Sequence, residues 1–250
     1  MKRQFAFIAF LLCAVLGMQG QVSHSDSLQN GRFYKFSFLG KERVPDALVY
    51  LPAPPSDKDA LYKNDVAKYK WGKEQRETLR GDTAIMDART DIPYLMQRFG
   101  WAIHKDITPD NCPQLAQLMR GVIQDIRGGM QNAKDYYARH RPYQVFKEHT
   151  SAPDYESDTD FTSYPSGHSV RAWALAMLFV ALDPAHEDAI MKTGYDMGES
   201  RVILGYHFES DVEASRLCAS AGFARLCAEP LFWAYLQLAR EELNAVDSKE

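Results

Sequence analysis

The sequence has little cysteine, no excess of positive charge and no long apolar run beyond its first 20 residues. Its four cysteines form no CxxC motif and no Cys/His cluster with zinc spacing, so a structural metal site is not expected. With 29 basic and 33 acidic residues, the formal net charge is −4, which does not favour binding to nucleic acid or anionic lipid. After residue 21 the longest apolar run is 172–182, too short for a membrane span and typical of a buried core helix.

The first 20 residues have a composition of their own. Lys2 and Arg3 precede the apolar stretch FAFIAFLLCAVLGM, and small residues follow at Gly17 and Gly20. The apolar part is shorter than the roughly 20 residues of a spanning helix, so the pattern predicts a secretory signal peptide over 1–20, cleaved near Gly20 or at Gly17. A lipoprotein site at Cys13 is disfavoured because a bulky leucine precedes it. Cleavage leaves 27 basic against 33 acidic residues, a net charge of −6.

Three cysteines remain after this cleavage. Cys218 and Cys227 fall in one predicted helix, where nine residues separate them by about 13 Å. That separation exceeds the roughly 7 Å that a disulfide allows between Cα atoms. A pair that involves Cys112 stays open, and at least one thiol is left over.

The rest of the chain predicts helices and no strands. Helical composition extends over 59–80, through DTAIMDA and IPYLMQRFGWAIH, and after Cys112 into one long helix or a pair broken at Gly128–Gly129 and stopped by Pro142. Further helices are predicted at 166–182, 185–204, 211–227 and after Pro230. A polar loop at 143–164 is long enough to suggest a function. We therefore expect an all-α single domain over 46–243, with an N-terminal segment at 21–45 and a polar tail at 244–250.

The stretch PSGH at 165–168 has the character of a helix N-terminus. Pro165 fits the first helical turn, where its missing N–H would have no partner, and a long apolar run follows. Ser166, Gly167 and His168 would then present free N–H groups. Such groups form a binding site for an anion.

The stretch KDYYARHRP places two cations seven residues apart. Lys134 and Arg141 are then two helical turns apart on one face, separated by about 10 Å along the axis, and their long side chains can converge on one anion. Taken alone, Arg127, Lys134, Arg139 and Arg141 are as well explained by a solvated basic stripe on a helix.

The stretch SRVILGYHFESD holds Arg201, His207 and Asp211. His207 and Asp211 are spaced i, i+4, so as neighbours on a helix Asp211 can accept a hydrogen bond from Nδ1–H and leave a lone pair on Nε2. A histidine held in this way acts as a metal ligand or as a nucleophile. A purely structural His–Asp pair is the alternative when the motif stands alone.

Taken together, the three stretches predict a phosphate site. Three cations, a helix N-terminus and an oriented histidine suit a compact, multiply charged oxyanion and require neither a metal nor another cofactor. We expect His207, neutral and held by Asp211, to attack phosphorus and form a phosphohistidine. We expect His168, protonated, to donate to the leaving oxygen and later to take a proton from water, which gives a bell-shaped pH profile with a mildly acidic optimum.

The motifs K-x6-R-P, PSGH and S-R-x5-H-x3-D resemble the signature of the phosphatidic-acid-phosphatase type 2 (PAP2) superfamily. Within it the chain resembles the bacterial class A non-specific acid phosphatases, over roughly residues 46–240. The resemblance implies an all-α bundle of the PAP2/haloperoxidase type, a periplasmic or secreted location, homo-oligomers, metal independence and broad action on small-molecule phosphomonoesters. It implies phosphate binding by Lys134, Arg141, Ser166, Gly167 and Arg201, with His168, His207 and Asp211 as catalytic residues.

Some features of that resemblance stay open. The 143–164 loop has no cysteine and Leu204 stands where some relatives carry one, so a family-type disulfide there is in doubt. Vanadium haloperoxidases share the signature but are usually much longer, and membrane lipid phosphatases need several spanning helices. A phosphate-binding protein would give Asp211 and the second histidine no purpose. The preferred phosphomonoester, transfer to alcohols and the number of subunits are not determined by the sequence.

Overall fold

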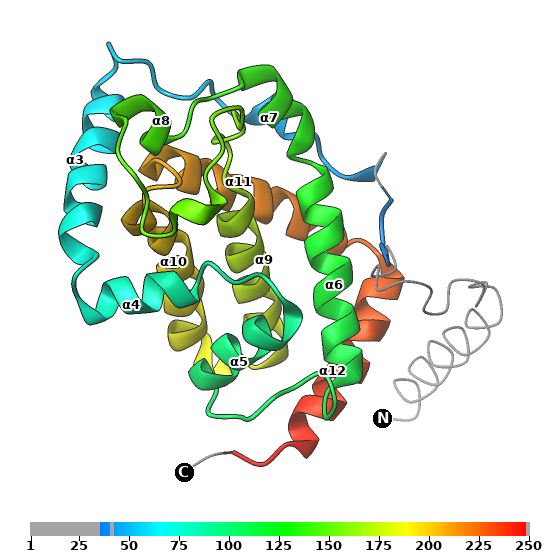
Figure 1. Cartoon of the computed structure of the whole chain (residues 1–250). Helices are drawn as coiled ribbons and strands as arrows, with labels where there is room; N and C mark the ends of the chain where they lie inside the picture. The colour runs from blue at the N-terminus through cyan, green and yellow to red at the C-terminus, as the bar shows by residue number, and fades with distance from the viewer. Residues whose placement is uncertain (1–35, 41–42, 249–250) are drawn as a thin grey trace, which may run out of the picture.

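Helix α9, Gly167–Leu182, forms the centre of the fold (Figure 1). A computed structural model describes residues 36–40 and 43–248, so the predicted signal peptide lies outside the described residues. Helix α9 is apolar on nearly all sides, and such a helix is stable only when other elements surround it. It packs against α10 (Glu187–Leu204), α11 (Glu209–Leu226), α6 (Pro113–Gly128) and, to a lesser extent, α12 (Pro230–Ala245).

The remaining helices cover this central group. Helices α3 (Ala60–Gln75) and α4 (Leu79–Met86) pack on α10, and α5 (Ile92–Ala102) packs on α10 and α6. The short α2 (Ala47–Tyr50) lies against α7 (Gln131–Tyr137). The loop after α7 carries α8 (Pro142–Phe146) and the 3-10 turn η3 (Pro153–Tyr155), and η4 (Pro184–His186) joins α9 to α10.

The described part of the chain contains no β-strand, only an isolated bridge between Lys105 and Ser248. The predicted all-α class is therefore confirmed. Helix α12 continues to Ala245, two residues into the segment expected to be a polar tail. In the part of the chain that the structure describes, no helix combines the length and apolar character of a membrane span.

Two proline predictions were wrong. Pro142 does not stop the preceding helix, because α7 already ends at Tyr137, where Ala138 adopts a left-handed backbone with φ 42°, and Pro142 begins α8. Pro165 is not in the first helical turn, because Ser166 caps α9 and the helix starts at Gly167. The stretch after Cys112 forms two helices, α6 and α7, separated at Gly129 and Met130, which is the second of the two predicted alternatives.

The thiols of Cys112, Cys218 and Cys227 are free. Cys112 is buried in the core directly before α6, and burial raises its pKa to about 11. These three residues thus contribute packing rather than cross-links among the described residues.

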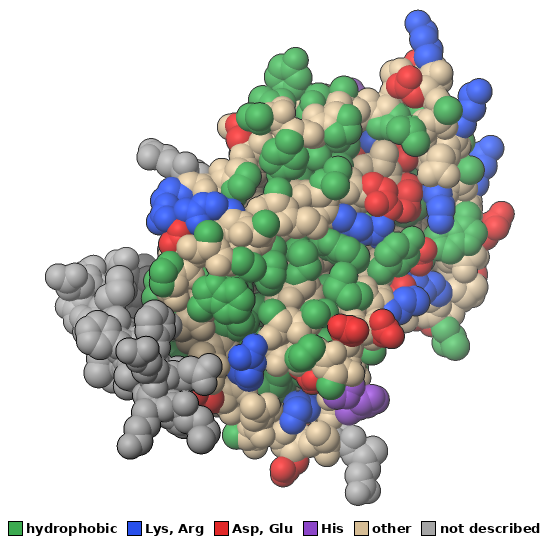
Figure 2. Space-filling view, turned by 180° about the vertical axis from the view of Figure 1, so that it is seen from behind, with side chains coloured by type: hydrophobic (Ala, Val, Ile, Leu, Met, Phe, Trp, Pro, Cys, Tyr) green, Lys and Arg blue, Asp and Glu red, His purple; other side chains and the backbone are tan. Residues whose placement is uncertain are grey.

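Charged side chains of both signs are distributed over the surface. Figure 2 shows the face turned away from the view of Figure 1, where hydrophobic side chains gather over the middle and acidic and basic side chains lie among them. This face presents no extended basic surface to a polyanion.

The contact between α9 and α10 depends on a glycine. A Cβ atom on Gly194 would lie 2.6 Å from the Ala176 Cβ and 3.1 Å from the Ala172 carbonyl oxygen. Replacing Gly194 by alanine should therefore push the two helices apart and lower the free energy of unfolding by about 1–3 kcal/mol, as measured by urea denaturation.

The matched control is Gly128→Ala at the end of α6, where a Cβ atom would meet nothing within 4 Å. This change should leave the stability unchanged or raise it by up to about 1 kcal/mol. Equal effects of the two substitutions would contradict the close packing of α9 on α10.

Candidate active site

The N-terminus of α9 is tied to α11 through Ser166. The Ser166 amide donates to the Asp211 carbonyl oxygen at 3.2 Å, and the Ser215 hydroxyl donates to the Ser166 carbonyl oxygen at 2.9 Å. The Ser166 hydroxyl oxygen accepts hydrogen bonds from the amide and the hydroxyl of Ser169, at 3.3 Å and 2.9 Å. Its own hydrogen is therefore available to another acceptor. The amides of Gly167 and His168 have no intrahelical acceptor, as at any helix start.

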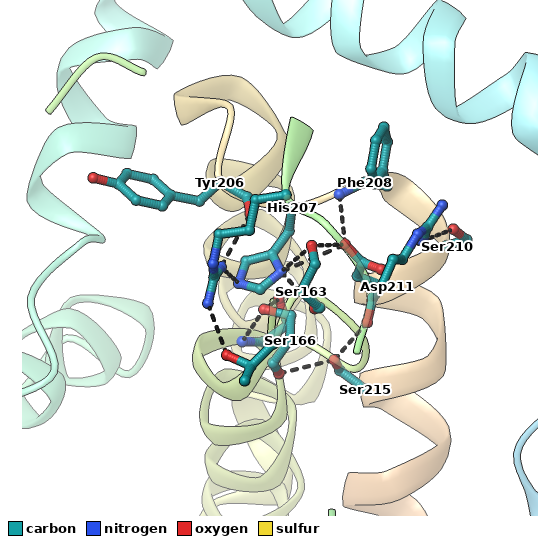
Figure 3. A network of polar contacts seen from close by, with 12 residues as sticks. Ser163, Ser166, Tyr206, His207, Phe208, Ser210, Asp211 and Ser215 are labelled. Atoms are coloured by element: carbon teal, nitrogen blue, oxygen red, sulfur yellow. Dashed lines mark hydrogen bonds and ion pairs between the residues drawn. The ribbon is translucent and has the colours of Figure 1, made fainter. Parts of the chain in front are cut away.

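His207 does not share a helix with Asp211. It lies two residues before α11, Phe208 is the N-cap, and Asp211 is the third helical residue. The Nδ1 atom of His207 is 2.8 Å from the Ser163 carbonyl oxygen and 3.5 Å from Asp211 Oδ2 (Figure 3). Because a carbonyl only accepts, Nδ1 is the protonated nitrogen. The expected tautomer is present, but the closer acceptor is the Ser163 backbone rather than the predicted Asp211 carboxylate.

The other ring nitrogen of His207 faces a donor. Its Nε2 atom is 3.0 Å from Nη1 of Arg141, and a guanidinium can only donate, so Nε2 carries the lone pair. The ring is 2% exposed, and burial together with Arg141 lowers the pKa of His207 to about 3. A neutral imidazole with a directed lone pair is the state required of a nucleophile or a metal ligand.

Asp211 is held as a carboxylate by several donors. The Ser163 hydroxyl and the Phe208 amide donate to Oδ2 at 2.7 Å and 2.8 Å, and Arg139 donates to Oδ1 at 2.5 Å. Burial alone would raise its pKa, but Arg139 and His207 outweigh burial, so the pKa of Asp211 lies well below its ordinary value. The second Nη atom of Arg139 reaches Asp65 on α3 at 2.8 Å.

Lys134 and Arg141 do converge, but not along one helix as predicted. Lys134 is in α7, whereas Arg141 is the residue that precedes α8. The Lys134 ammonium donates to the Thr162 carbonyl oxygen, and Arg141 Nη2 donates to the Thr162 hydroxyl at 3.3 Å. Arg141 also pairs with Asp160, its Nε donating at 2.9 Å. Burial and the neighbouring Arg141 lower the pKa of Lys134 to about 8.

Arg201 is the buried cation of the site. Its side chain comes from the last turn of α10 and lies over the Tyr206 ring at 4.7 Å, and the residue is 4% exposed. Its Nε and Nη1 atoms have no hydrogen-bond partner among the described residues. Burial, followed by Arg141, lowers its pKa to about 9. Buried polar groups are almost always paired, so an unpaired guanidinium marks a place for an anion.

His168 lies among these cations. Its Nε2 atom is 3.3 Å from the Ala88 carbonyl oxygen. Burial, Arg201 and Arg171 together lower its pKa well below the ordinary histidine value. These surroundings favour the neutral form of His168 in the free site, whereas the role of acid expected from the sequence requires a protonated ring.

Several residues of the site were missed in the sequence. Arg139 lies within the KDYYARHRP stretch and Ser163 lies two residues before Pro165, so their positions in the motifs could have drawn attention to them. Asp65 had no such signal, because it lies 74 residues from the arginine that it binds. Asp160 and Thr162 belong to the polar loop that was expected to have a function.

The contacts of Arg139 generate a stability prediction. Arg139→Met would leave the buried carboxylates of Asp65 and Asp211 without their cation, at a cost of about 3–5 kcal/mol near neutral pH. Because the pKa of Asp211 is lowered by folding, its ionised form stabilises the fold above about pH 4, and this contribution is lost as the pH falls. The difference in unfolding free energy between wild type and variant should therefore shrink in acid.

The measurement is urea denaturation of both proteins across pH 3 to 8. Arg89→Met is the control, because Arg89 pairs with Asp91 at the surface, where an ion pair contributes about 0–1 kcal/mol. A cost for Arg139→Met that is as small as the control, or that grows in acid, would contradict the role given to Arg139.

Comparisons with known proteins agree with the geometry. Residues 116–235 match the model of the PAP2 superfamily. The chain is 36% identical to a non-specific acid phosphatase of Providencia stuartii, over 82% of this chain and 84% of that protein. It is 32% identical to a non-specific acid phosphatase of Salmonella typhimurium, over 83% and 84% of the two chains.

The chain also matches a solved structure, that of a transmembrane PAP2-type phosphatidylglycerolphosphate phosphatase from Bacillus subtilis. The match covers 72% of this chain and 88% of the Bacillus chain. It is 20% identical and overlaps in part, with a TM-score of 0.47. The family predicted from the three motifs is confirmed by the two acid phosphatases and by the superfamily match: the chain belongs to the PAP2 superfamily and, within it, to the bacterial non-specific acid phosphatases.

Proposed function

We propose that this chain hydrolyses small-molecule phosphomonoesters through a phosphohistidine on His207, without a metal ion. The observation that supports this most strongly is Arg201, a buried guanidinium whose charge acts on both His168 and His207. Two of its nitrogen atoms, Nε and Nη1, have no hydrogen-bond partner among the described residues. An anion with several oxygens satisfies such a group, and phosphate has the matching geometry.

The phosphoryl group would lie between the cations and the start of α9. Arg201, Lys134 and Arg141 supply positive charge, and the amides of Gly167 and His168 supply N–H groups at the positive end of the helix dipole. The Ser166 hydroxyl has its hydrogen free to donate to a phosphate oxygen. These groups would stabilise the charge that spreads over the equatorial oxygens in the transition state.

The reaction would take place in two steps. In the first, the Nε2 lone pair of His207 attacks phosphorus in line, the N–P bond forms and the P–O ester bond breaks. His168 gives its proton to the leaving oxygen. In the second, water attacks the phosphohistidine, His168 takes a proton from that water, and phosphate is released. Ser163 and Asp211 hold Nδ1–H throughout, so the positive charge on the phosphorylated ring has a carboxylate at 3.5 Å.

Arg141 would have to change its partner during the first step. Its Nη1 atom donates a hydrogen bond to the lone pair that attacks phosphorus. Before the reaction, this hydrogen bond must break and the same N–H must donate to a phosphate oxygen instead. An arginine can rotate its planar fork from one acceptor to another without losing its charge. We infer that phosphate binding exposes the nucleophile by this exchange.

Metal independence is part of the same proposal. Cationic side chains and backbone N–H groups provide the positive charge that a metal would otherwise supply. Among residues 36–40 and 43–248, the His, Cys, Asp and Glu side chains form no group of three or more suited to a metal ion. The proposed location outside the cytoplasm rests on the signal-peptide pattern at 1–20, and assembly into homo-oligomers rests on the family resemblance alone.

The role of His207 can be tested with p-nitrophenyl phosphate at mildly acidic pH in excess EDTA. Wild type should release p-nitrophenol, and His207→Ala should lower kcat on the order of 10⁴-fold, because the covalent route is lost. Binding of inorganic phosphate, followed by calorimetry, should persist in this variant. Acid-labile label on histidine after rapid quenching with radioactive substrate would identify the intermediate.

Several outcomes would contradict this proposal. Turnover that disappears only in EDTA would indicate a metal-dependent enzyme. Phosphate binding by wild type without any turnover would indicate a binding protein. Label on a residue other than histidine would exclude the proposed nucleophile.

The surroundings of His168 generate a pH prediction. Burial and nearby cations lower the pKa of His168 in the free protein, whereas a bound phosphate dianion offsets the charge of the cations and raises this pKa again. Since His168 must be protonated to act as the acid, the alkaline limb of kcat should lie at higher pH than the alkaline limb of kcat/KM, after correction for ionisation of the substrate. Steady-state pH profiles measure both limbs.

His168→Asn serves as the matched variant for this profile. It should lose the alkaline limb, and it should slow an alkyl phosphate much more than 2,4-dinitrophenyl phosphate, whose leaving group needs no proton. Two results would contradict the role of His168 as the acid. One is that the alkaline limbs of kcat and kcat/KM coincide in wild type, and the other is that the variant is slowed equally on the alkyl and the dinitrophenyl phosphate.

A further inference from the structure

Two arginines beside the site have no part in the mechanism above. Arg127 lies in the last turn of α6, and its Nε atom is 4.0 Å from the point that a Cβ atom on Gly167 would occupy. Arg171 is in α9, four residues after Gly167 and three after His168, so it lies one turn further along the same helix face. Helices α6 and α9 pack side by side (Figure 1). The two guanidinium groups are close enough that the charge of Arg127 lowers the pKa of Arg171.

Among the described residues, neither arginine has an acidic partner. Arg139, Arg141, Arg216 and Arg225 all pair with carboxylates, but within residues 36–40 and 43–248 no carboxylate binds Arg127 or Arg171. Arg171 is half-buried, and burial together with Arg127 lowers its pKa to about 10. Two uncompensated like charges at one place destabilise the fold, so their position calls for an anion.

A phosphomonoester does not account for both groups. Lys134, Arg141 and Arg201, with the N–H groups at the start of α9, already supply the phosphoryl group with positive charge and donors. Arg127 and Arg171 remain as additional charge. Arg171 lies one turn after His168 in α9, and His168 is the residue proposed to protonate the leaving oxygen. A phosphate held by Arg127 and Arg171 would then belong to the leaving group.

We propose that Arg127 and Arg171 form a subsite for a second phosphate carried by the leaving group, and that the chain therefore prefers bisphosphorylated small molecules to monophosphates. Two guanidinium forks can take a phosphate in bidentate fashion, which fixes the leaving group in one orientation. Gly167 has no side chain, and the only atom of the described residues that a Cβ atom there would meet within 4 Å is Nε of Arg127, so the space beside this guanidinium is open. This inference rests on the proposed phosphatase function.

The test compares fructose 1,6-bisphosphate with fructose 6-phosphate, both of which are alkyl phosphates with similar leaving groups. The quantity compared is the ratio of kcat/KM for the bisphosphate to kcat/KM for the monophosphate. Two equivalent phosphates alone would make this ratio about two, so a ratio of about ten or more is expected for wild type. Arg127→Met and Arg171→Met should each lower this ratio, and the double variant should bring it close to two. Arg171→Lys should restore part of it, because a cation remains without the fork.

Arg225→Met is the matched control. Arg225 lies fourteen residues after Asp211 on α11, about 21 Å along the helix, and it pairs with Glu229. Its substitution should leave the ratio at the wild-type value. The ratio should also fall as salt concentration rises, and more steeply in wild type than in the double variant.

The outcomes separate this inference from the proposed function. A wild type that hydrolyses p-nitrophenyl phosphate but shows a ratio near two would overturn the subsite and leave the phosphatase intact. A wild type inactive on every phosphomonoester would overturn the proposed function itself. A ratio that is high in wild type and unchanged in the double variant would place the second phosphate elsewhere.

Discussion

The site depends on the way Asp211 holds two other segments of the chain against α11. Its carbonyl oxygen binds the Ser166 amide at the start of α9, and its carboxylate binds the Ser163 hydroxyl and Arg139. Arg139 in turn reaches Asp65 on α3. One residue at the beginning of α11 therefore fixes the stretch from Ser163 to the helix N-terminus and the loop between α7 and α8. The orientation of His207 follows from this arrangement, since its Nδ1–H lies between Ser163 and Asp211.

The charged groups around Asp211 fall into two sets, one in which opposite charges are paired and one in which positive charges are not. Arg139, Asp65 and Asp211 satisfy one another, so they stabilise the fold and contribute to binding only through geometry. Within the part of the chain that the structure describes, Arg201 and Lys134 lack carboxylate partners, and burial lowers the pKa of each. Their unpaired charge costs stability in the free protein. A substrate anion recovers that cost, which is the usual relation between a strained site and its ligand.

The sequence was sufficient for the helices that depend on a long local pattern. The apolar run after PSGH predicted α9 to within one residue, and the family motifs supplied every cation discussed under the proposed function. It failed where a single backbone conformation decides the outcome. The left-handed residue Ala138 ends α7 three residues before Arg141, so the spacing of Lys134 and Arg141 is not a helical spacing. Their convergence on Thr162 comes from the loop, which no periodicity describes.

The orientation of His207 illustrates a second limit. The i, i+4 spacing indicated a helical His–Asp pair, but His207 precedes the helix, and its closer acceptor is a backbone carbonyl 44 residues away. Backbone groups carry no sequence signal, so the role of the Ser163 carbonyl could not be predicted. The tautomer was still predicted correctly, because either acceptor requires a proton on Nδ1.

If His207 is the nucleophile and His168 the acid, as we propose, this cationic pocket would perform acid chemistry only with its substrate present. Burial and neighbouring arginines lower the pKa of both rings, so the free site favours neutral imidazoles. This state suits His207, which needs its lone pair, and not His168, which needs a proton. A phosphate dianion neutralises the surrounding charge and so raises the proton affinity of His168 when the leaving oxygen is about to need it. In the proposed mechanism, the cations that bind the substrate would therefore keep His168 unprotonated until the substrate has bound.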